Sequence, residues 1–258
     1  MIRVFIGYDA QEPVAFSVLA HSILRRASRP VSITPIALCN LEGILTRARQ
    51  PNQSTDFSFS RFLVPWICGF EGWSIFMDCD QLCLDDIAKL WALRDESKSV
   101  MCVKHDHRPT ETRKFLGHVQ TQYPMKNWSS VMLMNNRMCW RLTPDFVNTA
   151  TGLQLHRFEW LKGADWPKSV EDQIGELPRG WNHLVGYDEP ECAFPTCGCD
   201  LMENGKHNCP IKARHEHTLH NLHFTEGGPW FPGFDDVPFA DVWRRERNLA
   251  FSATVEPK

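Results

Sequence analysis

Short apolar runs, each long enough for one buried strand, recur along the chain and limit the folds that it can adopt. The runs are residues 4–6, 31–38, 73–77, 100–103 and 131–134. Between the first two, residues 13–24 carry apolar side chains at helical spacing after Pro13. This strand-helix-strand order is typical of a βαβ unit. The sequence therefore predicts an α/β fold with a mostly parallel, Rossmann-like sheet flanked by helices.

The remaining pattern fits one domain over residues 1–258, since 258 residues suit one large α/β unit better than two small ones. We expect loops at 40–59 and 105–128, and a strand at 183–185. The expected helices lie at 60–70, at 87–93, before Thr149, near Asp172 and at 236–250.

The charge balance argues against nucleic acid as a partner. The formal net charge is −3 and the isoelectric point is about 6.4, whereas a phosphate backbone selects for a basic surface. The sequence has neither a signal-peptide pattern at its start nor a long uncharged apolar stretch. The expectation is a cytoplasmic protein without a transmembrane segment.

The run at 73–77 ends in Asp78-Cys79-Asp80. Alternate residues of an extended chain face the same way, so the two carboxylates can share one divalent cation at the carboxyl end of the strand. The same tripeptide could also be an acidic turn at a strand end, because aspartate favours turns. From these residues alone, both interpretations stay open.

Further segments give the tripeptide a context. Phe59-Ser60-Arg61-Phe62 precedes it, and the later segments are Trp128-Ser129-Ser130-Val131-Met132-Leu133-Met134-Asn135, Glu171-Asp172-Gln173-Ile174, Leu177-Pro178 with Trp181-Asn182, and Leu222-His223-Phe224-Thr225 with Pro229-Trp230. In this order they resemble the motifs of family 8 glycosyltransferases, the family of glycogenin and bacterial lipopolysaccharide galactosyltransferases. The resemblance spans about residues 1–232.

The resemblance implies a GT-A fold, a Mn²⁺ or Mg²⁺ ion, and transfer of a hexose from a nucleotide sugar, usually a UDP-sugar, with retention. The acceptor would be a glycan or a lipid-linked saccharide. Carried over by position, Asp78, Asp80 and His223 would be the metal ligands. Arg61, Asp172 and Gln173 would be the catalytic residues, and the donor would contact Gly7, Tyr8, Asp9, Arg61, Asp78, Asp80, Ser129, Ser130, Gly227 and Gly228.

Two departures from the family pattern affect the donor site. A bulky Trp128 stands where the family has a small amide side chain, so the donor sugar cannot be transferred by analogy. Gly227-Gly228-Pro229 also lacks the lysine that the family places on the diphosphate. Another cation must then compensate. Arg61, Lys104 and Arg179 are the candidates, and helix amino termini also favour phosphate.

Retention can arise by two routes. In a double displacement, Asp172 is the nearest candidate nucleophile, whereas Gln173 is a poor one. In a same-face substitution, the leaving diphosphate is stabilised electrostatically and takes the acceptor's proton, and no enzyme nucleophile is needed. We favour the second route.

A Cys/His-rich insert at 188–219 contains Cys192, Cys197, Cys199 and Cys209. Their spacing is not a recurrent zinc pattern, yet a polar segment with few apolar residues needs a staple in order to fold. A structural Zn²⁺, disulfides and free thiols are the alternatives, and disulfides are disfavoured in a reducing cytoplasm.

The helix expected at 236–250 places Arg244, Arg245 and Arg247 beside Trp243, so it is either a capping helix, which we prefer, or a peripheral membrane contact. Two rival functions remain. One is a catalytically inactive, zinc-stapled carbohydrate-binding protein. The other is a sugar nucleotidyltransferase, which would need a Gly-rich basic loop after the first strand that this chain lacks.

Overall fold

The centre of the protein is a six-stranded sheet with the order β2-β1-β3-β6-β5-β7. The computed structural model describes residues 1–49, 53–105, 125, 128–162, 169–188, 202–203, 206–207 and 219–252. The strands are β1 (Ile2–Gly7), β2 (Val31–Ile36), β3 (Trp73–Met77), β5 (Val100–Cys102), β6 (Val131–Asn135) and β7 (Ile174–Glu176). Only β6 runs antiparallel to its neighbours in this sheet. The mostly parallel α/β sheet predicted from the sequence is therefore confirmed.

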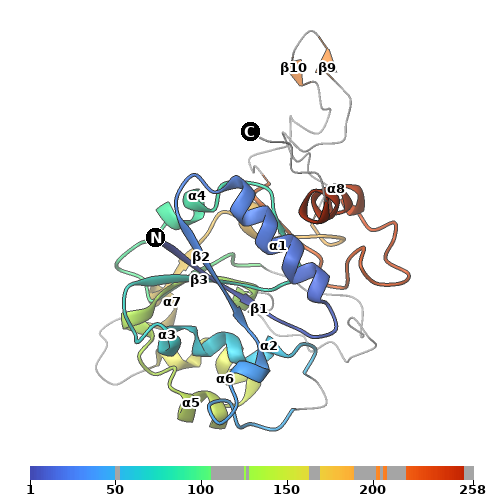
Figure 1. The fold of residues 1–258 in the computed structure, drawn as a ribbon. Helices are drawn as coiled ribbons and strands as arrows, with labels where there is room; N and C mark the ends of the chain where they lie inside the picture. Colours follow the sequence, from blue (N-terminus) through green and yellow to red (C-terminus); the bar gives the residue numbers. More distant parts are fainter. Residues whose placement is uncertain are drawn as a thin grey trace.

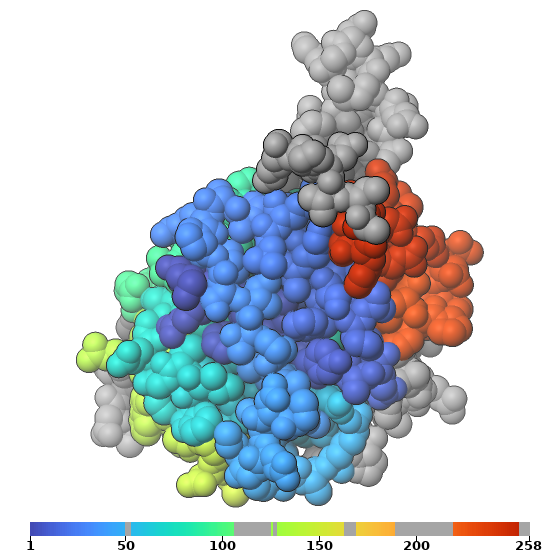
Figure 2. Space-filling view, in the orientation of Figure 1, coloured from blue at the N-terminus to red at the C-terminus, as the bar shows by residue number. Residues whose placement is uncertain are grey.

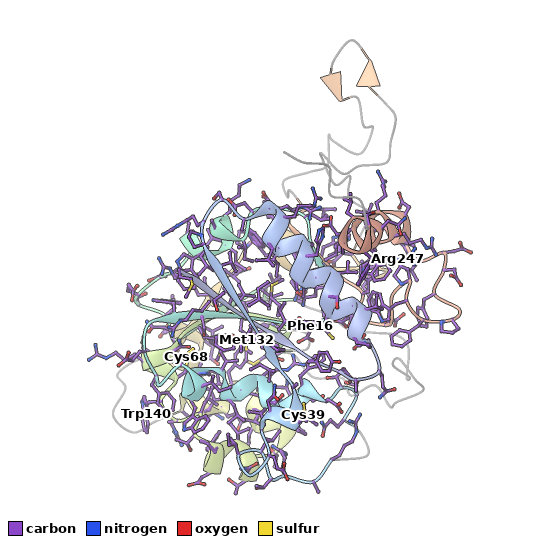
Figure 3. All side chains as sticks on the ribbon, in the orientation of Figure 1. Phe16, Cys39, Cys68, Met132, Trp140 and Arg247 are labelled. Atoms are coloured by element: carbon purple, nitrogen blue, oxygen red, sulfur yellow. The ribbon has the colours of Figure 1, made fainter. Side chains whose placement is uncertain are left out.

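Helices cover the sheet on both faces, which explains why β3 and β6 are buried throughout and mostly apolar. In Figure 1, α1 (Pro13–Arg26) and α4 (Ile87–Ala92) lie on one side. The other side carries α2 (Phe57–Ser60), α3 (Val64–Ile67), α5 (Pro144–Thr149) and α6 (Gly152–His156). Met132 of β6 lies between these layers in Figure 3.

The C-terminal helix α8 (Ala240–Phe251) packs beside α1, as the red and blue surfaces of Figure 2 show. Val242 and Trp243 are buried, as predicted for an amphipathic helix at this end of the chain. The helix begins four residues later than expected. Two of its arginines, Arg244 and Arg245, pair with Asp235 and Asp241, which fits a capping helix with a charged outer face.

A second, three-stranded sheet has the order β4-β11-β8. It consists of β4 (Gln81–Cys83), β8 (His183–Leu184) and β11 (Asn221–His223), and the antiparallel pairing of β4 with β11 brings residue 223 next to residue 81. Within the insert, β9 (Met202–Glu203) and β10 (Lys206–His207) form an antiparallel pair. Across the described ranges, no helix has both the length and the apolar character needed to cross a membrane.

The expected helix at 60–70 is instead three short pieces: α2, the 3-10 turn η2 (Arg61–Leu63) and α3. Pro65 explains the break, because proline has no N–H to continue the helical hydrogen bonds and its ring crowds the preceding turn. The second strand ends at Ile36, two residues before the expected end, because the 3-10 turn η1 (Leu38–Asn40) begins at Leu38. A further one-turn helix, α7 (Val170–Gln173), leads directly into β7.

Candidate metal centre

Three potential metal ligands meet at the carboxyl end of β3. Asp78 and Asp80 follow the strand, and His223 comes from β11, about 140 residues later in the chain. One ligand atom from each residue lies within 4.8 Å of the others. We call Asp78, Asp80 and His223 the metal-ligand cluster. The structure thus brings together the three residues that the family resemblance selected.

Asn182 fixes the orientation of the His223 ring. His223 Nδ1 lies 2.9 Å from Asn182 Oδ1, and Asn182 Nδ2 donates a 2.9 Å hydrogen bond to Ser130 Oγ. The amide oxygen requires a proton on Nδ1, so Nε2 of the neutral ring carries the free lone pair. Nε2 lies 3.4 Å from Asp80 Oδ2 and therefore points toward the carboxylates. This is the tautomer and orientation that a metal-binding histidine requires.

The electrostatics of the cluster favour a cation. Burial raises the pKa of Asp78 to about 7, and the nearby Asp80 adds to the rise while Arg61 opposes it. Burial lowers the pKa of His223, but the two carboxylates outweigh it and the net shift is upward. Asp80 Oδ1 is buried and has no hydrogen-bond partner among the described residues. A buried carboxylate oxygen of this kind is costly unless it binds a cation.

The donor set suits Mn²⁺ or Mg²⁺. Two carboxylates provide hard oxygen ligands, and one imidazole nitrogen favours Mn²⁺ over Ca²⁺. The residues present therefore fit the ion that the fold implies.

Arg61 lies directly behind the cluster. Its side chain is buried, and Nη1 lies 2.8 Å from Asp78 Oδ1 and donates a 2.9 Å hydrogen bond to Ser129 O. Its guanidinium also lies 5.2 Å from the ring centroid of Phe57 and 5.1 Å from that of Phe76. Arg61 thus offsets one of the two carboxylate charges. A direct contact between Arg61 and a donor remains a prediction.

Ser129 and Ser130 support Asp78 through their backbone carbonyls. Ser129 O accepts from Arg61, while Ser130 O accepts from the Asp78 backbone N–H at 3.0 Å and from Gln81 Nε2 at 2.9 Å. The two residues close η4 (Trp128–Ser130), immediately before β6. Both serines therefore lie at the cluster, and their predicted contact with a donor stays a prediction.

The turn after β1 lies at the same edge of the sheet. A Cβ on Gly7 would approach the Phe57 ring to 2.3 Å, so this position requires glycine. The Asp9 carboxylate accepts from the backbone N–H groups of Gln11 at 2.9 Å and Asp56 at 3.0 Å. Tyr8 packs its ring edge-on against a neighbouring aromatic of α1, with centroids 5.5 Å apart. The turn is well placed for a donor, although both Asp9 oxygens already have partners.

Gly227 and Gly228 follow β11 and shape the segment that closes over this edge. Gly227 has φ +133°, and a Cβ on Gly228 would lie 2.0 Å from the Trp230 ring. The two glycines therefore permit a tight turn under the indole. Their predicted contact with the donor is not tested by this geometry.

Sequence reasoning missed Glu12. This side chain is buried, and its Oε2 accepts a 3.1 Å hydrogen bond from Trp230 Nε1. Burial, together with the charges of Asp80 and Asp9, raises the pKa of Glu12 to about 8, although hydrogen bonds from Cys79 and Trp230 oppose the rise. Glu12 is thus a further acid beside the cluster, and it joins the β1 turn to the closing segment.

Asp172 and Gln173 are not brought to the cluster, contrary to their predicted role beside the reacting carbon. They precede β7, at the amino-terminal edge of the sheet, and Gln173 O accepts from Ser99 N just before β5. The strand register places Gln173 level with Trp73, five residues before Asp78, or about 16 Å along the strand direction. The physical reason is the shortness of α7, because a single turn cannot carry the pair back to the opposite edge.

The cysteine predictions have separate outcomes. Cys192, Cys197, Cys199 and Cys209 lie outside the described residues, so the zinc, disulfide and thiol alternatives remain predictions. Six other cysteines are free thiols, of which Cys79, Cys83, Cys102 and Cys139 are buried. Those four are small core residues, as their apolar sequence context indicated.

Comparison with solved structures identifies the fold. An active-site mutant of LgtC matches with a TM-score of 0.57 and 11% identity, covering 99% of this chain and 98% of that one. The galactosyltransferase LgtC in complex with donor and acceptor sugar analogues matches with a TM-score of 0.55 and 13% identity, covering 100% and 98%. The bifunctional glycosyltransferase WbbM matches with a TM-score of 0.54 and 15% identity, and this chain spans 49% of its length.

The protein therefore has the fold of the GT-A glycosyltransferases, with a candidate divalent-cation site where β3 ends. No protein-family model matches the sequence. The chain belongs to the family of Protein CDI of Arabidopsis thaliana, to which it is 42% identical over 251 residues, 95% of this chain and 85% of that protein.

Proposed function

We propose that the protein is a metal-dependent glycosyltransferase. It would move a hexose from a nucleotide sugar, a UDP-sugar in the first instance, to a glycan or lipid-linked acceptor with retention of anomeric configuration. The observation that carries the proposal is the cluster of Asp78, Asp80 and His223 at the carboxyl end of β3 in a GT-A fold. Two carboxylates and one oriented imidazole form a site for one cation in the crevice where α/β folds bind ligands.

Each residue of the cluster has a distinct task in this proposal. Asp78 and Asp80 hold the ion, while Asn182 keeps His223 Nε2 aimed at it. Arg61 offsets part of the carboxylate charge from behind. When bound, a divalent cation supplies Lewis-acid stabilisation of the departing diphosphate.

Retention is best explained by same-face substitution. The candidate nucleophile Asp172 lies at the opposite edge of the sheet, where its carboxylate accepts a 2.9 Å hydrogen bond from Ser169 Oγ. A covalent route through this residue has no support from its position. In the same-face route, the leaving diphosphate accepts the proton of the acceptor hydroxyl, and the protein contributes orientation and charge.

The test is a screen of purified protein against UDP-, GDP- and TDP-sugars with and without Mn²⁺, following thermal stability and turnover. We expect metal-dependent stabilisation and slow hydrolysis with one donor, both lost in an Asp78→Asn, Asp80→Asn double variant. A matched control is the Asp235→Asn, Asp241→Asn double variant. It removes the same amount of charge from two exposed residues, one just before α8 and one within it.

The outcomes separate the proposal from its rivals. In a parallel assay, pyrophosphate release from a nucleoside triphosphate and a sugar 1-phosphate would indicate a sugar nucleotidyltransferase, and sugar binding without turnover would indicate a carbohydrate-binding protein. No response of the wild-type protein to any donor in the presence of Mn²⁺ would refute the transferase proposal.

A further inference from the structure

The candidate site contains a surplus of negative charge. Asp78 and Asp80 face one arginine, Arg61, which is already bonded to Asp78 and to a backbone carbonyl. A divalent cation would neutralise the two carboxylates, but a nucleoside diphosphate brings at least two further negative charges and gains one when the sugar leaves. Stable binding therefore calls for another positive group near the cluster.

Arg179 does not provide that group in this structure. It lies in η7 (Arg179–Asn182) and pairs with Asp188, whose carboxylate also accepts a 2.8 Å hydrogen bond from the backbone N–H of Leu184. Its guanidinium is thus committed to the turn that follows β8. Of the three cations that the sequence suggested, Lys104 remains.

Lys104 lies at the correct edge of the sheet. It follows the last residue of β5 by two positions, and its ammonium lies 5.9 Å from the ring centroid of Trp128, which begins the η4 turn that ends at Ser130. The Asp78 backbone N–H donates to Ser130 O, so Asp78 lies at the same level one strand further on. Two strand spacings are about 10 Å, which the long stem of a lysine and one phosphate group together can bridge.

Trp128 holds the Lys104 side chain in place. The indole Nε1 donates a 2.9 Å hydrogen bond to His105 O, and the Lys104 ammonium lies 5.9 Å from the centroid of the ring. Both side chains are partly exposed. Within the described ranges, no carboxylate forms an ion pair with Lys104. A fixed aromatic face thus lies beside the ammonium group at this edge of the sheet.

We propose that Lys104 binds the diphosphate of the nucleotide-sugar donor, with Trp128 as the platform that positions its ammonium group. This inference rests on the proposed function and adds a binding residue to it. Trp128, which stands where the family has a small amide side chain, would thus serve to position Lys104.

Calorimetric titration with UDP and with GDP, each in the presence of Mn²⁺, tests the inference on the full-length protein. We expect Lys104→Met to lower the affinity for the nucleotide that wild type binds by about tenfold or more. This is the usual effect of losing one charge-assisted hydrogen bond. Lys104→Arg should recover most of the affinity. The matched control is Lys98→Met, since Lys98 lies at the other end of β5 and donates to Asp172 O.

The corresponding monophosphate identifies which group is recognised. Loss of affinity in Lys104→Met should be smaller for UMP or GMP than for the diphosphate, and melting temperatures without ligand should match wild type. Equal diphosphate affinity in wild type and Lys104→Met, or an equal loss in Lys98→Met, would overturn the inference while leaving the transferase intact. Failure of wild type to bind any diphosphate with Mn²⁺ would instead count against the proposed function.

Discussion

At the scale of single residues, the site depends on groups that support the metal-ligand cluster from outside it. Asn182 is such a residue, because it is fully buried and its amide joins His223 to Ser130. Glu12 is another, since it connects the β1 turn to Trp230. Asn182 belongs to one of the motif segments, but the sequence did not reveal that it supports His223, and Glu12 was not identified at all. Glu12 precedes Pro13 at a helix start, where an acid is ordinary, and its partners are distant along the chain.

Asn182→Ala should weaken Mn²⁺ binding by about tenfold to a hundredfold, because the His223 ring would lose the hydrogen bond that fixes its tautomer. Titration followed by the electron paramagnetic resonance signal of free Mn²⁺ measures this. Asn148→Ala is the control, since that amide anchors the loop at Thr46 and Arg47, away from the cluster. Unchanged Mn²⁺ affinity in Asn182→Ala would show that Asn182 does not orient a ligand.

At the scale of elements, α1 and α8 are joined by a charge cluster at Glu246. Its buried carboxylate lies 2.9 Å from Arg25 Nη2 and 2.7 Å from Arg26 Nη2. Burial would raise the pKa of Glu246, but the two guanidinium groups lower it to about 2, below the ordinary value of 4.5. The charged form is therefore stabilised by folding.

Glu246→Gln should lower the free energy of unfolding at pH 7 by about 1 to 3 kcal/mol, as expected for a partly buried ion pair that loses one charge. Because the folded pKa lies below the unfolded one, this contribution is complete above pH 4.5 and is lost as the pH falls toward 2. Urea unfolding at several pH values measures the difference between the two proteins. The exposed pair on the same helix offers a control, and Asp241→Asn should cost at most about 0.5 kcal/mol.

The elements also show what the sequence could and could not predict. β3 and β6 were predictable because both faces are buried and four of the five residues in each strand are apolar. β4 and β11 were not, because their buried positions include polar residues. Asn221 Nδ2 donates to Gln81 Oε1 at 2.9 Å, and this pairing across the strands only exists after folding. Hydrophobic pattern alone cannot reveal a strand whose interior is satisfied by hydrogen bonds.

At the scale of the whole molecule, the sheet places two sets of motif residues at opposite edges. The order of motifs along the chain predicted the metal-ligand cluster, since strand ends and the β11 pairing bring those residues together. The same order failed for Asp172 and Gln173. A motif fixes a residue's place in the sequence, whereas the length of the following helix decides at which edge of the sheet that residue lies.

This separation makes a prediction about catalysis. Asp172→Ala should retain transfer within a few-fold of wild type, because the carboxylate lies far from the cluster and accepts a hydrogen bond from Ser169 at the start of its own helix. Steady-state turnover with the donor identified in the screen measures this. A loss of several orders of magnitude, with the melting temperature unchanged, would reinstate Asp172 as a nucleophile and contradict the same-face route.

The pairing of β4 with β11 also has a consequence for biosynthesis. Two of the three cation ligands emerge from the ribosome early, whereas the third lies in a strand made after some 140 further residues. Until that strand docks, the growing polypeptide holds two aspartates without their imidazole partner. Under the proposed function, tight binding of a cation would require β11 to be in place, so that metal loading would measure how much of the protein has completed its folding.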